Sequence, residues 1–518
     1  MMGISNAQKS AYNILTSVLG QVITIVLGVV IPRLVLVNLG SENNGLLSSI
    51  TQVLGYASLL EAGVGLASLQ ALYKPVAEHD EASVNAIMSA TNLYYKRTGI
   101  AYLLTVIILS AIYPAIIKSS LPYGTITIVV LISGLPGVVN YYFQGKYKIL
   151  LQAEGRTYII TNLTTVIGIL TSVGKILLLL LGFGVIAVQS LYLALSLVQM
   201  IYIDFYIRKN YAWIDLTVNP AYDKLSQRNS VLAHQLSGTI FSSTDVVTLS
   251  IFCGLSVVSV YSMYALLFGM VGTLLSNLAG SITFVLGQEL GINQKKYGKL
   301  QDSFELVYIS LSFSLFFIAY TYILPFLKIY TAGITDINYV DRALSVLFVA
   351  IALLENSRLS SAKAIHVAGH FRQTQWHAWV EMAINIIVSL IGVLAWGVYG
   401  VLIGTIAALL FRANAMIIYA NKKILHRSPW KTYRRWLVNL ALFIVVTVLS
   451  KPLFVRIALD TYPRIILWAA ITSVVVIPLF FVVASMFDRE TYRYAKTLVV
   501  PYLKQARGKL KRRSQTHD

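Results

Sequence analysis

Long runs of apolar residues recur from one end of the chain to the other, separated by short polar loops. Most runs hold about 20 residues or more, which at 1.5 Å per residue is enough to cross a ~30 Å hydrocarbon layer. Such runs are too long for the core of a water-soluble protein. We therefore predict an all-α integral membrane protein with about fourteen transmembrane helices. The expected spans are 12–37, 44–72, 99–117, 124–143, 158–182, 184–207, 231–253, 257–286, 305–327, 342–365, 378–396, 398–419, 436–455 and 464–487.

The composition supports the same class. Hydrophobic residues make up 57% of the 518 and charged residues only 12%, about half the charged fraction of a soluble protein. The first apolar run is too long for the core of a signal peptide, so we expect it to remain as the first span. A single cysteine, Cys253, excludes a disulfide within the chain.

The distribution of Lys and Arg predicts the orientation. Of the 41 basic residues, about 30 fall in alternate loops and the C-terminal segment and about 7 on the opposite side, so both termini are expected in the cytoplasm. The net charge of +20 then faces the anionic cytoplasmic leaflet rather than a nucleic acid. The basic tail from 488 onward is expected to lie against those headgroups. The outer loops are short, which leaves no room for an extracytoplasmic catalytic domain.

A weak internal repeat appears at a lag of about 215 residues. The segment 153–156 before the fifth span is echoed by 368–372 before the eleventh, and 182–186 by 398–402 at the start of the sixth and twelfth. Six helices per copy is an even number, so both copies enter the membrane in the same sense. We predict two parallel six-helix lobes and a C-terminal helix pair, with lobes at 1–228 and 229–435, the pair at 436–487 and a tail at 488–518.

Two similar lobes suit alternating access, in which they rock about a central cavity. A duplicated scaffold without a transport role is the alternative interpretation.

Basic residues inside the spans are the candidates for binding an anionic substrate. A cation at a helix centre costs ~2.5–3.5 kcal/mol even on a lenient insertion scale, so it usually has a function. Lys175, Arg412, Arg358 and Arg33 lie in such positions. Lys175 and Arg412 have no local explanation. Arg33 can instead extend to the interface, and Glu355 at i−3 can neutralise Arg358.

Intramembrane acidic residues form a second set, Glu61, Asp245, Glu355 and Glu381. They can hold coupling protons or cations, or pair with the basic residues. Glu61, Asp245 and Glu355 are our candidates for ion coupling or gating. Arg33 and Asp245 occupy near-equivalent places in the two predicted lobes, toward the outer side, so we expect them to form part of an outer gate.

Enzyme chemistry is not predicted. The chain has no nucleotide-binding G-x-x-x-x-G-K-[ST] loop, no G-x-S-x-G element and no H-E-x-x-H. His366 and His370 have a metal-like i,i+4 spacing but lack a nearby carboxylate in sequence, so no metal site and no cofactor are expected.

Several short elements resemble a known family. Arg33-Leu34 with 39–45 resembles the end of the first helix in polysaccharide flippases of the multidrug/oligosaccharidyl-lipid/polysaccharide exporter (MOP) superfamily. The segment 61–65 resembles their acidic-Gly-x-Gly element in the second helix. Residues 235–245, followed by Gly254 and 260–262, resemble the start of their second lobe. With the repeat and the extra helix pair, the likeness spans nearly the whole chain and points to Wzx-type flippases.

The resemblance implies a secondary transporter that moves an oligosaccharide repeat unit on undecaprenyl diphosphate from the cytoplasmic to the outer leaflet of the inner, cytoplasmic membrane. It implies this lipid-linked oligosaccharide and membrane lipids as partners, with polysaccharide polymerase and glycosyltransferases as candidate protein partners. A multidrug-type exporter of small molecules from the same superfamily is the first alternative. A membrane glycosyl polymerase is the second, although it would need a large outer loop.

Overall fold

The computed structural model describes residues 6–61, 63–225 and 228–497. Within these ranges the regular structure is helical throughout. The α-helices are α1 (Asn6–Ala57), α2 (Val64–Ala77), α3 (Glu81–Ile116), α4 (Tyr123–Val139), α5 (Gly145–Ala153), α6 (Thr157–Leu180), α7 (Val185–Asn210), α8 (Arg228–Phe252), α9 (Leu255–Ile292), α10 (Gln294–Tyr330), α11 (Arg342–Ser357), α12 (Leu359–Val367), α13 (Phe371–Trp396), α14 (Val398–Tyr419), α15 (Trp430–Val455) and α16 (Tyr462–Phe487). Short 3₁₀ turns at Ser58–Leu60 and Tyr222–Leu225 and π-helical turns at Asn140–Gln144 and Ala420–Ile424 complete the set.

Each of the fourteen predicted spans coincides with helical structure. By length and apolarity alone, eleven helices of the described chain can cross a membrane, or up to twelve if the bent pair 27–60 and 64–77 forms one span. The remaining predicted spans correspond to α8, whose apolar part Leu236–Phe252 is shorter, and to the two spans shared by α1 and α2. The all-helical membrane fold expected from the apolar runs is confirmed.

Two glycines interrupt the first helices. At Gly40, inside α1, φ is 81° and ψ 172°, so the long helix is two helices joined at a kink. At Gly63, before α2, φ is 87°, and the axis bends by 50° at this break. Glycine adopts such left-handed conformations without the steric cost that a Cβ would impose. The second bend places Glu61 at a helix interruption.

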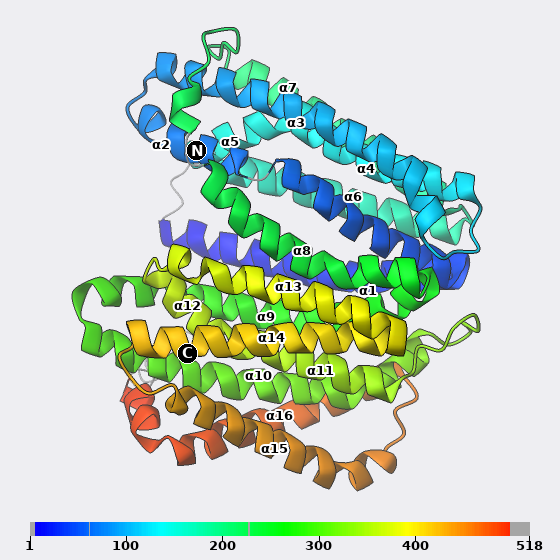
Figure 1. Cartoon of the computed structure of the whole chain (residues 1–518), viewed down its shortest axis with the longest axis vertical. Coiled ribbons are helices and arrows are strands. Elements are labelled where there is room, and N and C mark those ends of the chain that lie inside the picture. Colours follow the sequence, from blue (N-terminus) through cyan, green and yellow to red (C-terminus); the bar gives the residue numbers. More distant parts are fainter. Residues whose placement is uncertain (1–5, 62, 226–227, 498–518) are drawn as a thin grey trace, which may run out of the picture. The chain divides into compact units, whose positions relative to one another are not determined.

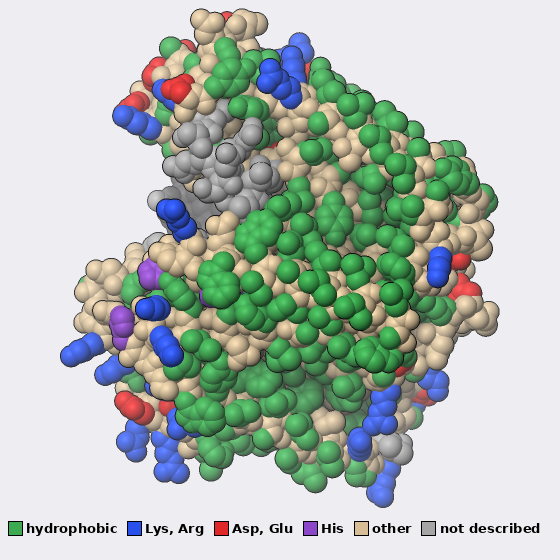
Figure 2. Space-filling model, in the orientation of Figure 1, with side chains coloured by type: hydrophobic (Ala, Val, Ile, Leu, Met, Phe, Trp, Pro, Cys, Tyr) green, Lys and Arg blue, Asp and Glu red, His purple; other side chains and the backbone are tan. Residues whose placement is uncertain are grey.

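Large apolar side chains cover the outer faces of the helices. Leu181, Leu394, Leu449 and Val474 are each more than 70% exposed, and Figure 2 shows hydrophobic side chains along the visible helix flanks, with Lys and Arg gathered toward the helix ends. Exposed apolar area on this scale is normal only in contact with lipid or another apolar surface. Together with the span lengths, it makes this a multi-pass membrane protein.

The chain divides into two compact units. The first comprises Met1–Ser262, Gly333–Asn338 and Val393–Val401, and the second Met263–Ala332, Tyr339–Gly392 and Leu402–Asp518. In the first, α3 lies alongside α4, and α6 alongside α7 (Figure 1). The domain limits inferred from the repeat, at 228, 435 and 487, stay a prediction.

In the second unit, α10 packs against α11, α15 and α16. Phe313, Phe316, Phe317 and Phe480 are almost fully buried. Phe317 contacts the ring of Phe443 on α15 edge-on, with ring centroids 5.7 Å apart, and the ring of Phe480 on α16 at 6.4 Å. This aromatic core fixes the C-terminal helix pair to α10.

Candidate functional site

A buried carboxylate joins two arginines in the second unit. Glu381 on α13 lies with its Oε1 3.1 Å from Nη1 of Arg358 and its Oε2 3.6 Å from Nε of Arg412. Glu381 and Arg412 are only 6% and 8% exposed. Arg412 Nη1 also donates to the carbonyl oxygen of Thr374, at 3.4 Å. Two guanidinium groups and one carboxylate carry one net positive charge in this three-residue cluster, which we call the arginine site, and the exposed carboxylate of Glu355 is close enough to act on Glu381 electrostatically.

Local sequence explains how three helices present these side chains. Arg358 sits at the junction where α11 ends and α12 begins, Glu381 in the middle of α13 and Arg412 in α14. The α13 and α14 backbones approach closely because Gly404 has no side chain: a Cβ there would lie 2.6 Å from the Ser389 backbone nitrogen. Small residues allow such contacts between membrane helices. A hydrogen bond of 3.0 Å from Asn385 to Thr405 holds the same pair together.

Aromatic groups border the arginine site. The His377 ring is 5% exposed and lies against the rings of Trp376, Phe411 and Tyr419. Its Nδ1 is buried and has no hydrogen-bond partner among the residues that the structure describes. The site therefore combines surplus positive charge with a polar ring nitrogen and flat apolar surfaces.

Two of the residues selected from the sequence, Arg358 and Arg412, thus meet around one carboxylate. Glu355, the i−3 neighbour considered for Arg358, is exposed on α11, and the ion pair of Arg358 is formed with Glu381 instead. Glu381 belonged to the acidic set without an assigned role. The signal that could have selected it is its position in an apolar helix, where a lone carboxylate requires a cationic partner.

The other selected residues lie in the first unit. Lys175 on α6 is half-buried, and its Nζ lies over the Tyr192 ring of α7, 5.3 Å from the centroid. Such a cation–π contact stabilises a cation that lacks water. Arg33 is half-buried beside Pro32 in α1. Asp245 on α8 is 4% exposed and accepts a hydrogen bond from Tyr261 Oη at 3.0 Å. The outer gate expected from Arg33 and Asp245 stays a prediction.

Glu61 occupies the break between the Ser58–Leu60 turn and α2. Its Oε1 accepts a hydrogen bond of 2.6 Å from Tyr95 Oη on α3. Gly65, one turn later, packs so closely that a Cβ would come within 2.6 Å of the same carboxylate oxygen. A carboxylate held at an interrupted membrane helix has the chemistry needed to carry a proton or cation, so Glu61 stays a coupling candidate.

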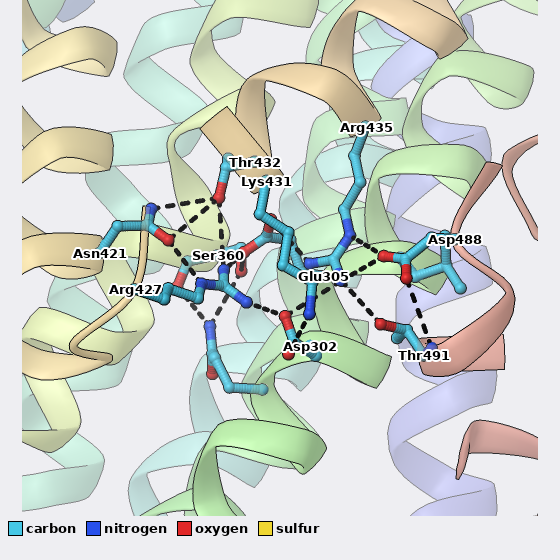
Figure 3. Close-up of polar contacts among 12 residues, drawn as sticks. Asp302, Glu305, Ser360, Asn421, Arg427, Lys431, Thr432, Arg435, Asp488 and Thr491 are labelled. Atoms are coloured by element: carbon cyan, nitrogen blue, oxygen red, sulfur yellow. Dashed lines mark hydrogen bonds and ion pairs between the residues drawn. The ribbon is translucent and has the colours of Figure 1, made fainter. Parts of the chain in front are cut away.

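A second charged cluster was not anticipated. At one end of the second unit, three acidic and three basic side chains interlock (Figure 3). Arg435 contacts Asp302 Oδ1 at 3.0 Å, Glu305 Oε1 at 3.0 Å and Asp488 Oδ2 at 2.6 Å. Arg427 pairs with Asp302 and with Glu305, and Lys431 pairs with Asp302. We call these six residues the ionic network. Its charges balance, which indicates a structural role rather than a binding site.

Comparison with known proteins rests on structure, because no family model and no curated protein matches the sequence. The lipid II flippase MurJ in an inward closed conformation aligns with a TM-score of 0.70 at 14% identity, over 92% of this chain and 99% of MurJ. A multidrug resistance MATE transporter of the MOP superfamily, inward-facing, aligns at 0.63 and 16% identity, over 77% of this chain and 94% of its own.

A MOP superfamily transporter from Pyrococcus furiosus aligns at 0.51 and 14% identity, over 79% of this chain and 96% of its own. At these identities the likeness concerns the fold. The chain therefore has the helical membrane fold that transporters of the MOP superfamily share.

Proposed function

We propose that this protein is a secondary transporter that flips a polyprenyl-diphosphate-linked oligosaccharide from the cytoplasmic to the outer leaflet by alternating access. The observation that carries the proposal is the arginine site, in which two guanidinium groups share a single carboxylate inside membrane-spanning helices. The proposal includes location in the cytoplasmic membrane with both termini in the cytoplasm, as the distribution of basic residues predicts.

The chemistry of the cargo explains why such a site is needed. Bare transfer of a diphosphate into hydrocarbon costs on the order of tens of kcal/mol. Arginine presents a fork of donors that matches phosphate oxygens, and it stays charged when partly buried. The surplus charge at Arg358 and Arg412 supplies a counter-ion for the headgroup, while Trp376 and Phe411 offer flat surfaces of the kind on which sugar rings pack.

The extent of the structural likeness favours a flippase over a multidrug exporter. The MATE alignment uses 94% of that transporter but only 77% of this chain, whereas the MurJ alignment uses 99% of MurJ and 92% of this chain. The lipid II flippase thus aligns with more of this chain than the MATE transporter does. An added helix pair suits a cargo with a long lipid anchor that must stay in the bilayer.

A flipping assay tests the proposal. Purified protein is reconstituted into vesicles that contain a polyprenyl-diphosphate oligosaccharide with a fluorescent sugar, and a membrane-impermeant quencher scores the fraction that crosses. We expect Arg412→Gln and Arg358→Gln to slow transfer at least tenfold. Arg464→Gln, which removes an exposed arginine paired with Asp460, is the matched control and should flip at the wild-type rate.

Two results would overturn the proposal. Wild-type protein that leaves the lipid untouched but exports a small organic cation would indicate the multidrug function. Normal flipping by both arginine variants would separate the arginine site from transport. Lys175→Gln tests the second predicted cavity residue in the same assay, and a rate equal to wild type would remove Lys175 from the site.

A further inference from the structure

The end of α16 forms one wall of a groove of about 450 Å³. The other wall is the helical segment 489–497, which follows a turn at Asp488. Across the turn, the Tyr492 ring meets the ring of Phe481 edge-on, with centroids 6.0 Å apart. A groove of this size lies within the range of small-molecule sites.

The two walls of the groove differ in polarity. Phe481, Val482 and Met486 are its apolar part. Arg489, Arg493 and Lys496 are its cationic part, and their i, i+4, i+7 spacing places them on one face of the segment. The groove therefore combines an apolar wall on α16 with a wall on the 489–497 segment that carries three cations.

A buried hydroxyl on the apolar wall suits a bound ligand. Ser485 lines the groove one position before Met486 and is only 6% exposed. Its Oγ has no hydrogen-bond partner within the described part of the chain. A buried hydroxyl without a partner destabilises the protein, and an acceptor on a bound molecule would remove that penalty.

The ionic network holds the groove in shape. Asp488 at the turn accepts hydrogen bonds from Arg435 at 2.6 and 2.8 Å and from the Thr491 backbone N–H at 3.4 Å. These contacts fix the start of the 489–497 segment. They also neutralise Asp488, while the other carboxylate beside the turn, Glu490, is exposed and is not part of the groove lining.

We propose that this groove is a specific site for an anionic phospholipid. The phosphate lies among Arg489, Arg493 and Lys496, an ester oxygen accepts from Ser485, and an acyl chain runs over Phe481, Val482 and Met486. A phospholipid matches this lining because its acyl chain is apolar, its ester oxygen is a hydrogen-bond acceptor and its phosphate is anionic. The site is independent of the proposed transport function, and with both termini in the cytoplasm it serves the inner leaflet.

Charge complementarity selects this occupant over others. A free phosphate would leave the apolar part uncovered, and an uncharged lipid would leave three cations without a counter-ion. Basic residues near an anionic leaflet contribute about fivefold each to binding at low salt. Three of them give roughly a hundredfold preference for phosphatidylglycerol over phosphatidylcholine. Salt would screen part of this preference if the lipid were held only by diffuse electrostatic attraction.

Native mass spectrometry of the full-length protein, titrated with phosphatidylglycerol, tests the site. We expect one tightly held lipid per chain and a loss of at least tenfold in its affinity in the triple variant Arg489→Gln, Arg493→Gln, Lys496→Gln. The charge-matched control is Lys422→Gln, Lys423→Gln, Arg434→Gln, three exposed cations of the same unit outside the groove, and it should bind as wild type does. Ser485→Ala should weaken binding severalfold without any change of charge.

Several outcomes would overturn the proposal. Equal losses in the triple variant and its control, both abolished by salt, would show diffuse attraction only. Equal affinity for glycerol 3-phosphate would show an anion site without a lipid chain, and tighter binding of a polyprenyl diphosphate would assign the groove to that lipid class. Flipping in vesicles of pure phosphatidylcholine reports the transport function separately, so failure of one proposal is distinguishable from failure of the other.

Discussion

Replacement of Arg435 by glutamine is the sharpest test of how the second unit is held together. Arg435 is 3% exposed and binds three carboxylates, with Thr491 Oγ1 as a further acceptor at 3.0 Å. Asp302 and Glu305 keep cationic partners in the variant because Arg427 contacts both of them. Asp488 loses the only side chain with which it forms an ion pair in the described structure. The variant therefore leaves one buried negative charge uncompensated.

Removal of one partner from a buried ion pair typically costs 3–5 kcal/mol. We expect Arg435→Gln to destabilise the protein by about that amount, and not by the sum of its separate contacts, because the remaining cations redistribute among Asp302 and Glu305. The double variant Arg435→Gln, Asp488→Asn removes the orphaned charge as well. It should recover at least 2 kcal/mol, since a matched polar pair replaces a lone carboxylate.

Thermal unfolding of the protein in lipid nanodiscs, followed by intrinsic fluorescence, measures both effects. Arg464→Gln serves as the control, because its ion pair with Asp460 is exposed and such pairs contribute little. A midpoint for Arg435→Gln equal to that of the control would refute the structural role of the network. A double variant less stable than the single one would refute the assignment of the orphaned charge to Asp488.

Three further predictions concern neighbouring features. Glu381→Gln leaves Arg358 and Arg412 facing each other without their carboxylate, so we expect the free energy of unfolding to fall by about 3 kcal/mol. Binding of pyrophosphate should be unimpaired or tighter, and weaker binding by calorimetry would contradict a cationic site. Gly404→Ala forces α13 and α14 apart and should lower the free energy of unfolding by about 1–3 kcal/mol. The control is alanine at exposed Gly124, where a Cβ meets nothing within 4 Å, and it should leave the melting temperature unchanged. Burial raises the pKa of Asp488, but attraction and hydrogen bonds from Arg435 outweigh it and hold this pKa below 3.8. A carboxyl group whose pKa is lower in the folded than in the unfolded protein stabilises the fold at pH values above its unfolded pKa, and this stabilisation is lost as the pH falls through its folded pKa. The stability advantage of wild type over Asp488→Asn should therefore shrink below about pH 4. An advantage that grows in acid would contradict this prediction.

The span pattern was readable from sequence because the bilayer imposes it. A helix that crosses ~30 Å of hydrocarbon needs about 20 apolar residues, whatever it packs against. Each predicted span accordingly coincides with helical structure. Arg358 and Arg412 could be selected for the same reason, since a cation inside an apolar run is costly and stands out.

The partner of Arg358 could not be read from sequence. Spacing favoured Glu355, which would share a helix face with Arg358 in one continuous helix. Arg358 keeps a helical conformation between α11 and α12, with φ −78° and ψ −17°, but the Glu355 side chain is exposed and forms no ion pair with Arg358 among the described residues. The carboxylate that reaches Arg358 is Glu381, on a different helix and 23 positions away.

The sequence by itself determined the membrane class, the helices and the intramembrane charges, because these follow from the local cost of placing each residue in lipid. Only the tertiary structure decided which charges meet. Arg435 and Glu305 lie 130 positions apart, one just before a predicted span and the other at the first residue of another, where they look like ordinary charges at span ends. Their burial in one network, and the groove that Asp488 shapes beside it, depend on how α10, α15 and α16 pack. No single segment carries that information, because the stabilising energy exists only once all three helices are in place.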